Sequence, residues 1–298
     1  MNKNVLVTGA AGFVGTNLLP NLYKAGYQVT AIIKNENERR RIKIPAEIIV
    51  HDLSNEDILR LKIKRQDIII HLAAQISSKS KEPFIKNNVE ATRNLVEIAK
   101  MVKAKKIILF SSAAVTSKRL DWYAQTKQEK EEIIKNSKLN YVIIRPSMIY
   151  GPGDDKNLGW MAMFIKKVPV IPIPGNGLYG RQPVYVEDLC KIVVKIARRD
   201  KNKKVYEIHG KDYVTLLEMI KVIQEELNLH KKIVKIPLRL MSQLILLQEK
   251  IFISPKFTAD QINSLTSGEK FKGDDWWNEF EIKPTNIKKG IHKMLNSK

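Results

Sequence analysis

Residues 4–22, NVLVTGAAGFVGTNLLPNL, form the stretch that decides the fold. The stretch opens with an apolar run, passes through three glycines and ends with leucines at helical spacing. A buried strand, a glycine turn and a helix in this order let the backbone approach a pyrophosphate at the amino terminus of the helix. The pattern therefore predicts a dinucleotide-binding turn. The residues that we assign to it are Gly9, Gly12, Phe13, Val14 and Gly15.

The segments that follow alternate between short apolar runs and helical patterns. Alternation of this kind is typical of an α/β fold with a Rossmann-type, doubly wound parallel sheet. Ligands of such sheets bind at the carboxyl ends of the strands. The expected strands after the first are 28–33, 48–50, 67–70, 107–110, 141–144 and 205–208, with a helix over 83–102.

The chain is expected to divide into two lobes. Residues 1–150 form the dinucleotide-binding domain, with 182–210 returning to it, while 151–181 and 211–298 form a smaller, C-terminal substrate lobe. The substrate lobe starts with a segment rich in glycine and proline. Within it, the apolar run 236–253 is open to two interpretations, an amphipathic membrane-surface helix or packing against its own lobe. We favour packing.

Residues 106–134, KIILFSSAAVTSKRLDWYAQTKQEKEEII, carry the candidate chemistry. A strand delivers Ser111 and Ser112 at its carboxyl end, and on the helix that follows Tyr123 and Lys127 share a face one turn apart. Tyrosine is a poor base at neutral pH, and a neighbouring ammonium is expected to lower its pKa. With a serine to hold a hydroxyl or carbonyl, the set predicts the acid–base half of a hydride-transfer site.

The end of the second expected strand bears on the cofactor. A carboxylate is usual there when the ribose is unphosphorylated, whereas a cation suits a 2′-phosphate. Here Lys34 occupies the position, and the first acid is Glu36. This favours NADP slightly over NAD, although Lys34 can equally be one more solvated lysine.

Composition limits the other classes of function. The 298 residues include 52 Lys+Arg and 31 Asp+Glu, and 52 − 31 gives a net charge of +21. The charges are scattered, which favours a lysine-rich surface over a nucleic-acid site, although a role at a membrane surface stays open. The single Cys190 excludes an internal disulfide, and no apolar run reaches a membrane-spanning length. We expect a cytoplasmic protein without a metal or a transmembrane segment, and a homodimer stays open.

Several ordered motifs resemble the extended short-chain dehydrogenase/reductases, the NAD(P)-dependent epimerase/dehydratase family. The resemblance implies that Ser112, Tyr123 and Lys127 are catalytic and that the substrate is a nucleotide sugar, its diphosphate held by Asn157 and Arg181. It adds to the cofactor site Asp52, Leu53, Ala73, Ala74, Asn88, Ser111, Tyr123, Lys127, Pro146 and Met148. The motifs are Thr8–Gly15, Asp52-Leu53, His71–Ala74, Asn88-Val89-x-x-Thr92, Ser111-Ser112, Tyr123-x-x-x-Lys127, Arg145–Pro152 and Arg181–Leu189.

Departures from the family pattern narrow the reaction. Ala113 and Ala114 stand where dehydratases of this family carry an Asp-Glu pair, which argues against 4,6-dehydration. Thr116 and Met148 replace a common tyrosine and asparagine, and Met148 would suit an apolar pocket. Epimerisation and reduction of a 4-keto sugar both remain, as in surface-polysaccharide or sugar-nucleotide metabolism. Reduction of an apolar ketone and a non-catalytic NADP-sensing protein are the alternatives.

Overall fold

The computed structural model describes residues 3–55, 57, 63–117, 120–200, 202–241, 243, 268, 270, 273 and 275–297. The chain forms two compact units. The first comprises Met1–Ser147, Val186–Ile208 and Gly273–Lys283, and the second comprises Met148–Tyr185, His209–Lys272 and Pro284–Lys298. Residues 182–185 thus belong to the second unit and 273–283 to the first.

A seven-stranded parallel sheet organises the first unit, in the order β11-β6-β5-β4-β1-β2-β3. The chain builds outward from β1 in one direction and then crosses to β4 to build in the other, so the order reverses between β1 and β4. In a doubly wound sheet, this is where a ligand binds. The predicted fold class is confirmed. The strands are β1 (Asn4–Thr8), β2 (Gln28–Ile33), β3 (Glu47–Val50), β4 (Ile68–His71), β5 (Lys106–Phe110), β6 (Tyr141–Pro146) and β11 (Lys204–Ile208).

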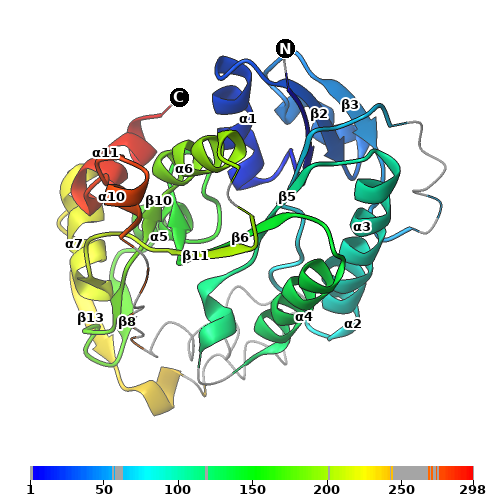
Figure 1. Cartoon of the computed structure of the whole chain (residues 1–298). Coiled ribbons are helices and arrows are strands. Elements are labelled where there is room, and N and C mark those ends of the chain that lie inside the picture. The colour runs from blue at the N-terminus through cyan, green and yellow to red at the C-terminus, as the bar shows by residue number, and fades with distance from the viewer. Residues whose placement is uncertain are drawn as a thin grey trace. The chain divides into compact units, whose positions relative to one another are not determined.

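Helices cover both faces of this sheet (Figure 1). On one face α1 (Phe13–Lys24) packs against α6 (Val186–Arg198), and on the other α3 (Ala91–Met101) packs against α4 (Trp122–Asn136). Apolar side chains of α3 and α4 are buried against alternate residues of the central strands, so the sheet holds α4 in place. Shorter elements are η1 (Glu36–Arg41), α2 (Glu82–Phe84), η3 (Ile85–Glu90), η4 (Ala113–Thr116) and α10 (Trp276–Glu279).

The helix expected over 83–102 is more complex than its sequence pattern. It runs from Glu82 to Met101, and η3 inside it is a π-helical segment. Such segments are rare and often mark functional sites, because the extra residue changes which side chains face inward. In this one Asn88 is completely buried.

The second unit has its own apolar core. Its helices α5 (Leu158–Lys167), α7 (Leu216–Glu226) and α11 (Ile287–Asn296) enclose this core, and Thr215 starts α7 with a capping box to Glu218. Of the apolar run 236–253, only 236–241 and 243 lie among the described residues, so its predicted packing is not tested. The strand pairs are β7 (Ile149–Tyr150) with β10 (Val184–Tyr185), β8 (Ile171–Pro174) with β13 (Ile233–Ile236), and β9 (Gly180–Arg181) with β12 (Val214–Thr215).

Candidate active site

The glycine turn after β1 is shaped for close backbone approach. Gly9 has a φ of +64°, and a Cβ there would lie 2.7 Å from the amide nitrogen of Ala73, at the exit of β4. A Cβ at Gly15 would overlap the carbonyl oxygens of Gly9 and Ala10. Gly12 is exposed at the start of α1, and its N–H donates to the Gly9 carbonyl at 3.0 Å. These features fit a pyrophosphate held at the helix amino terminus.

His71, at the end of β4, is a buried structural link. Its Nδ1 lies 2.7 Å from the Thr8 hydroxyl and its Nε2 3.1 Å from the Thr92 hydroxyl. Burial, together with the charges of Lys130 and Lys127, holds the pKa of His71 well below 6.5, so the ring is neutral. Because Thr92 donates its own proton to the Asn88 carbonyl at 2.6 Å, it accepts from Nε2–H of His71. His71 thus links β1, β4 and α3.

Asn88 fastens the loop that leaves β4. Its Oδ1 accepts from the Gln75 backbone N–H at 2.8 Å, and its Nδ2 donates to the Gln75 carbonyl at 3.1 Å. The same Nδ2 donates to the Thr126 hydroxyl on α4 at 3.0 Å. The side-chain amide therefore positions this loop, which includes the half-buried Ala73 and Ala74.

Lys34 and Asp52 form an ion pair beyond the ends of β2 and β3. The Lys34 ammonium lies 2.9 Å from the Asp52 carboxylate and donates to the Asn87 side chain at 3.2 Å. Burial raises the pKa of Asp52, but bonds from Lys34 and Ser54 outweigh it and bring the pKa to about 2. Because the Lys34 side chain is 51% exposed, a ligand phosphate can still reach it. Leu53, next to the pair, is buried.

The three candidate catalytic residues meet where β5 ends and α4 begins. Ser112 caps η4 by accepting from the Ala114 N–H at 3.2 Å, and it hydrogen-bonds the Tyr123 hydroxyl. Asp121 caps α4 by accepting from the Ala124 N–H at 2.8 Å. Lys127 is 3% exposed and donates to the Phe110 carbonyl at 3.0 Å, and its Nζ lies 5.5 Å from the centre of the Tyr123 ring. Ser111, next to Ser112, is buried.

The expectation that Tyr123 has a lowered pKa is wrong. Burial raises the pKa of Tyr123 above 10, and the nearby Asp121 charge adds to this, although the hydrogen bond with Ser112 opposes both. Burial also lowers the pKa of Lys127 to about 8, against the opposing charge of Glu131. At neutral pH the site therefore holds a neutral tyrosine beside a largely charged lysine.

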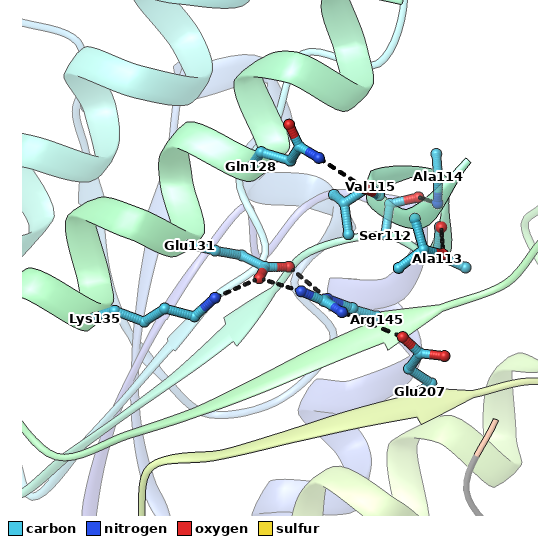
Figure 2. A network of polar contacts seen from close by, with 10 residues as sticks. Ser112, Ala113, Ala114, Val115, Gln128, Glu131, Lys135, Arg145 and Glu207 are labelled. Atoms are coloured by element: carbon cyan, nitrogen blue, oxygen red, sulfur yellow. Dashed lines mark hydrogen bonds and ion pairs between the residues drawn. The ribbon is translucent and has the colours of Figure 1, made fainter. Parts of the chain in front are cut away.

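Three charged residues near this site were not assigned a role from the sequence. Lys130 is completely buried and donates to the Ala73 carbonyl at 2.8 Å. Glu131 is 2% exposed and accepts two hydrogen bonds from Arg145, at 2.7 and 2.8 Å (Figure 2). The sequence signal for Glu131 was its helical register, one turn beyond Lys127, whereas Arg145 stood at the start of a quoted motif.

Three predicted residues lie in the second unit, and Pro146 lies just before it. Pro146 is buried at the end of β6, and Met148 is half-buried against the second core. The Asn157 side chain donates to the Ile149 carbonyl at 3.0 Å and its N–H donates to Asp154 at 2.8 Å. Arg181 is half-buried on β9, where it pairs in register with Val214.

The described residues offer neither a metal-ion cluster nor a membrane-spanning helix. In that part of the chain, no three or more His, Cys, Asp or Glu side chains cluster in a way that could hold a metal ion. Nor does any helix there have both the length and the apolar character required to cross a bilayer.

Known proteins resemble this chain along most of its length. The ceramide reductase of Caulobacter vibrioides is 29% identical over 195 residues, which are 65% of this chain but only 61% of that protein. The UDP-glucose 4-epimerase of Vibrio cholerae is 26% identical over 251 residues, 74% of this chain and 75% of the relative. The crystal structure of a UDP-glucuronic acid 4-epimerase from Bacillus cereus with NAD superposes with a TM-score of 0.73. That match is 23% identical and covers 97% of this chain and 96% of the other.

A family model matches more than half of the chain. The model described as the NAD dependent epimerase/dehydratase family matches residues 5–209. This range contains the glycine turn, nearly all of the sheet and the Ser112–Tyr123–Lys127 set. The chain belongs to the NAD dependent epimerase/dehydratase family.

Proposed function

We propose that the protein catalyses hydride transfer between NAD(P) and a ring carbon of a nucleotide sugar. The observation that carries this is the Ser112–Tyr123–Lys127 cluster at the end of β5, with a hydroxyl, a phenol and an amine within reach of one another. Proton transfer to or from the reacting oxygen by such a group contributes roughly 10²- to 10⁴-fold to the rate. A non-catalytic sensor has no need for this set.

The first unit would hold the dinucleotide with its backbone. Gly9, Gly12 and Gly15 would leave room for the pyrophosphate, Phe13 and Val14 lie in the first turn of α1, and the exit loops of β3 and β4 would hold the nucleoside. When bound, the nicotinamide supplies or accepts the hydride. Ser112 would orient the substrate oxygen, and Lys127 would stabilise the phenolate that Tyr123 leaves behind.

Lys34 favours a reductase. A reductase must exchange its dinucleotide in every turnover, whereas an epimerase keeps it through the ketone intermediate. Because Lys34 stands at the ribose position, where a cation suits NADP, we place 4-keto-sugar reduction ahead of epimerisation. In either reaction, Tyr123 would give its proton to the oxygen of a carbonyl that is being reduced. Dinucleotide that co-purifies in NAD form and supports conversion without added cofactor would reverse that order.

NADP is the proposed cofactor, with Lys34 as partner of the 2′-phosphate. The ammonium is half-exposed at the end of β2, and three arginines follow in η1. The Asp52 carboxylate opposes a phosphate, so the preference over NAD is expected to be modest.

Met148 and one relative support a second candidate, reduction of an apolar ketone. Met148 stands where nucleotide-sugar enzymes of the family often have asparagine, and it packs against the second core. One relative is named a ceramide reductase, and the lipid in that name supports an apolar substrate.

A substrate panel separates the two candidates. The purified protein with NADPH would be offered UDP- and dTDP-linked 4-keto sugars beside apolar ketones, and the loss of NADPH absorbance would be followed. We expect turnover with a nucleotide-linked ketone and little with the free sugar. Turnover restricted to the apolar ketones would replace the first candidate by the second. If neither class of ketone supports oxidation of NADPH, the assignment of hydride transfer is contradicted.

A further inference from the structure

Glu131 lies at the centre of a charged network that joins three elements of the first unit. Its carboxylate accepts from Arg145 on β6 through both Nε and Nη2, and from Lys135 one turn further along α4 at 3.1 Å (Figure 2). Arg145 also donates to Glu207 on β11 at 3.2 Å. The carboxylate is therefore fixed from two sides while it remains almost completely inaccessible to water.

A buried ion pair of this kind contributes little to stability by itself. The desolvation of two charges can exceed their attraction, and apolar residues of similar volume often serve equally well. Here burial works against the ionised form of Glu131, and the bonds from Arg145 reverse this, so the pKa of Glu131 lies below 4.5. The network keeps Glu131 negatively charged at a buried place where no water solvates the carboxylate. This points to a role for the charge itself.

The charge lies one helical turn beyond Lys127. Tyr123, Lys127 and Glu131 follow at intervals of four residues on α4, so all three share one face. Burial disfavours the Lys127 ammonium, and the negative charge of Glu131 favours it. The carboxylate therefore acts on the cation that the catalytic tyrosine needs.

Other charged and titratable groups surround Lys127, and they act differently. Lys130 on α4 is so deeply buried that its pKa lies well below 10.5, and His71 on β4 is neutral. Arg145 on β6 and Lys135 on α4 are cations, and both are paired with Glu131. The charged side chains on the other elements packed against α4 are exposed, namely Glu82 on α2, Lys86 and Glu90 on η3, and Arg93, Glu97 and Lys100 on α3.

We propose that Glu131 is a positioning residue that keeps Lys127 in its ammonium form beside Tyr123, with Arg145 and Glu207 holding the carboxylate in place. The proposal rests on the proposed function, in which Lys127 supports proton transfer by Tyr123. It assigns to the network a part in the chemistry rather than in tying α4 to the sheet.

The direct test is the protonation of Lys127 in the complete chain without substrate. Lysine labelled with carbon-13 at Cε would be followed by NMR from about pH 5 to about pH 11, and the Lys127 signal would be assigned by its loss in Lys127→Met. In the wild type this signal is expected to titrate near pH 8. In Glu131→Gln, it should titrate at a lower pH, because the negative charge is gone.

Two matched variants separate electrostatics from structure. Lys135→Gln breaks an ion pair of the same carboxylate but leaves it charged and held by Arg145, so the Lys127 signal should stay or move to a higher pH. Glu132→Gln makes the same chemical change at an exposed neighbour on α4 and should leave it unmoved. If Glu131→Gln does not fold, Glu131→Asp provides the test. Its shorter side chain moves the carboxylate away from Lys127, so the titration point of Lys127 should still fall.

An unchanged Lys127 titration in Glu131→Gln would overturn the proposal. An equal downward movement in Lys135→Gln would do so as well, since it would show a structural effect. Activity gives the second readout: at about pH 8, kcat of Glu131→Gln should fall roughly tenfold, as expected when most of the ammonium is lost, with KM little changed. The NMR result needs no substrate, so a wrong substrate or reaction would leave it standing, whereas failure of the coupling would leave the proposed function standing.

Discussion

The Lys127 ammonium lies 5.5 Å from the centre of the Tyr123 ring and is tied to the Phe110 carbonyl at 3.0 Å. It cannot move away from the tyrosine without breaking this buried hydrogen bond, which is costly. The backbone at the end of β5 therefore holds the cation where a phenolate would form. This relationship links the fold to the chemistry and has measurable consequences.

The burial of Lys127 should make stability depend on pH. Its pKa falls from 10.5 to about 8 on folding, so the unfolded chain binds the proton more tightly. Stability from this group therefore rises between the two pKa values and is lowest below pH 8. Relative to Lys127→Met, the free energy of unfolding of the wild type should increase by up to about 3 kcal/mol over that window. Urea unfolding across the window measures it.

An exposed lysine provides the control for this effect. Lys86 lies on η3 and is exposed, so Lys86→Met should leave the pH dependence of the wild type intact. Parallel stability curves for the wild type and Lys127→Met would contradict the prediction, because they would show that Lys127 has an ordinary pKa in the folded protein.

Lys34 should discriminate between the two dinucleotides. A 2′-phosphate gains a charge-assisted hydrogen bond from the ammonium, so Lys34→Ala should weaken NADPH by about 1.5–3 kcal/mol and hardly affect NADH. Calorimetric titration of both cofactors into the wild type and the variant gives the four affinities. Lys24→Ala, which removes an exposed lysine at the end of α1, is the control. Tighter binding of NADH by the wild type, or no loss in Lys34→Ala, would exclude the NADP preference.

Arg181 should matter for the substrate and not for the cofactor. If its guanidinium holds the diphosphate, Arg181→Ala should weaken UDP or dTDP by roughly 2–3 kcal/mol, the scale of a charge-assisted hydrogen bond. NADP affinity should stay the same, because the dinucleotide is held by the glycine turn. Calorimetry with UDP and dTDP tests this, with Lys211→Ala as a control on the same unit. An unchanged nucleotide affinity would favour the apolar ketone instead.

Local sequence patterns were sufficient to predict the main strands and helices of the first unit. Strand, glycine turn and helix over residues 4–22 predicted β1 and α1, and the spacing of Tyr123 and Lys127 predicted that they share a face of α4. These features depend on neighbours in the sequence, and the structure reproduces them because burial of each apolar run agrees with its local preference.

The parts that sequence could not supply depend on contacts far along the chain. Lys130 and Glu131 stand in the run KQEKEE, which is typical of a solvated helix face, yet both are buried because the sheet covers that face. The partner of Glu131 is Arg145 on another element. In the same way, Trp276 and Phe280 are buried in the first unit, where Phe280 packs against Tyr206, although they follow the second unit in sequence.

The most direct test of the central claim compares the wild type with Tyr123→Phe in a single turnover. Enzyme saturated with NADPH is mixed with the nucleotide-linked ketone that the panel selects, and hydride transfer is read from the loss of NADPH absorbance. We expect the rate in Tyr123→Phe to fall roughly 10²- to 10⁴-fold, with NADPH affinity unchanged, because only the proton donor is removed. A rate within a few-fold of the wild type would show that Tyr123 does not transfer the proton and would contradict the proposed mechanism.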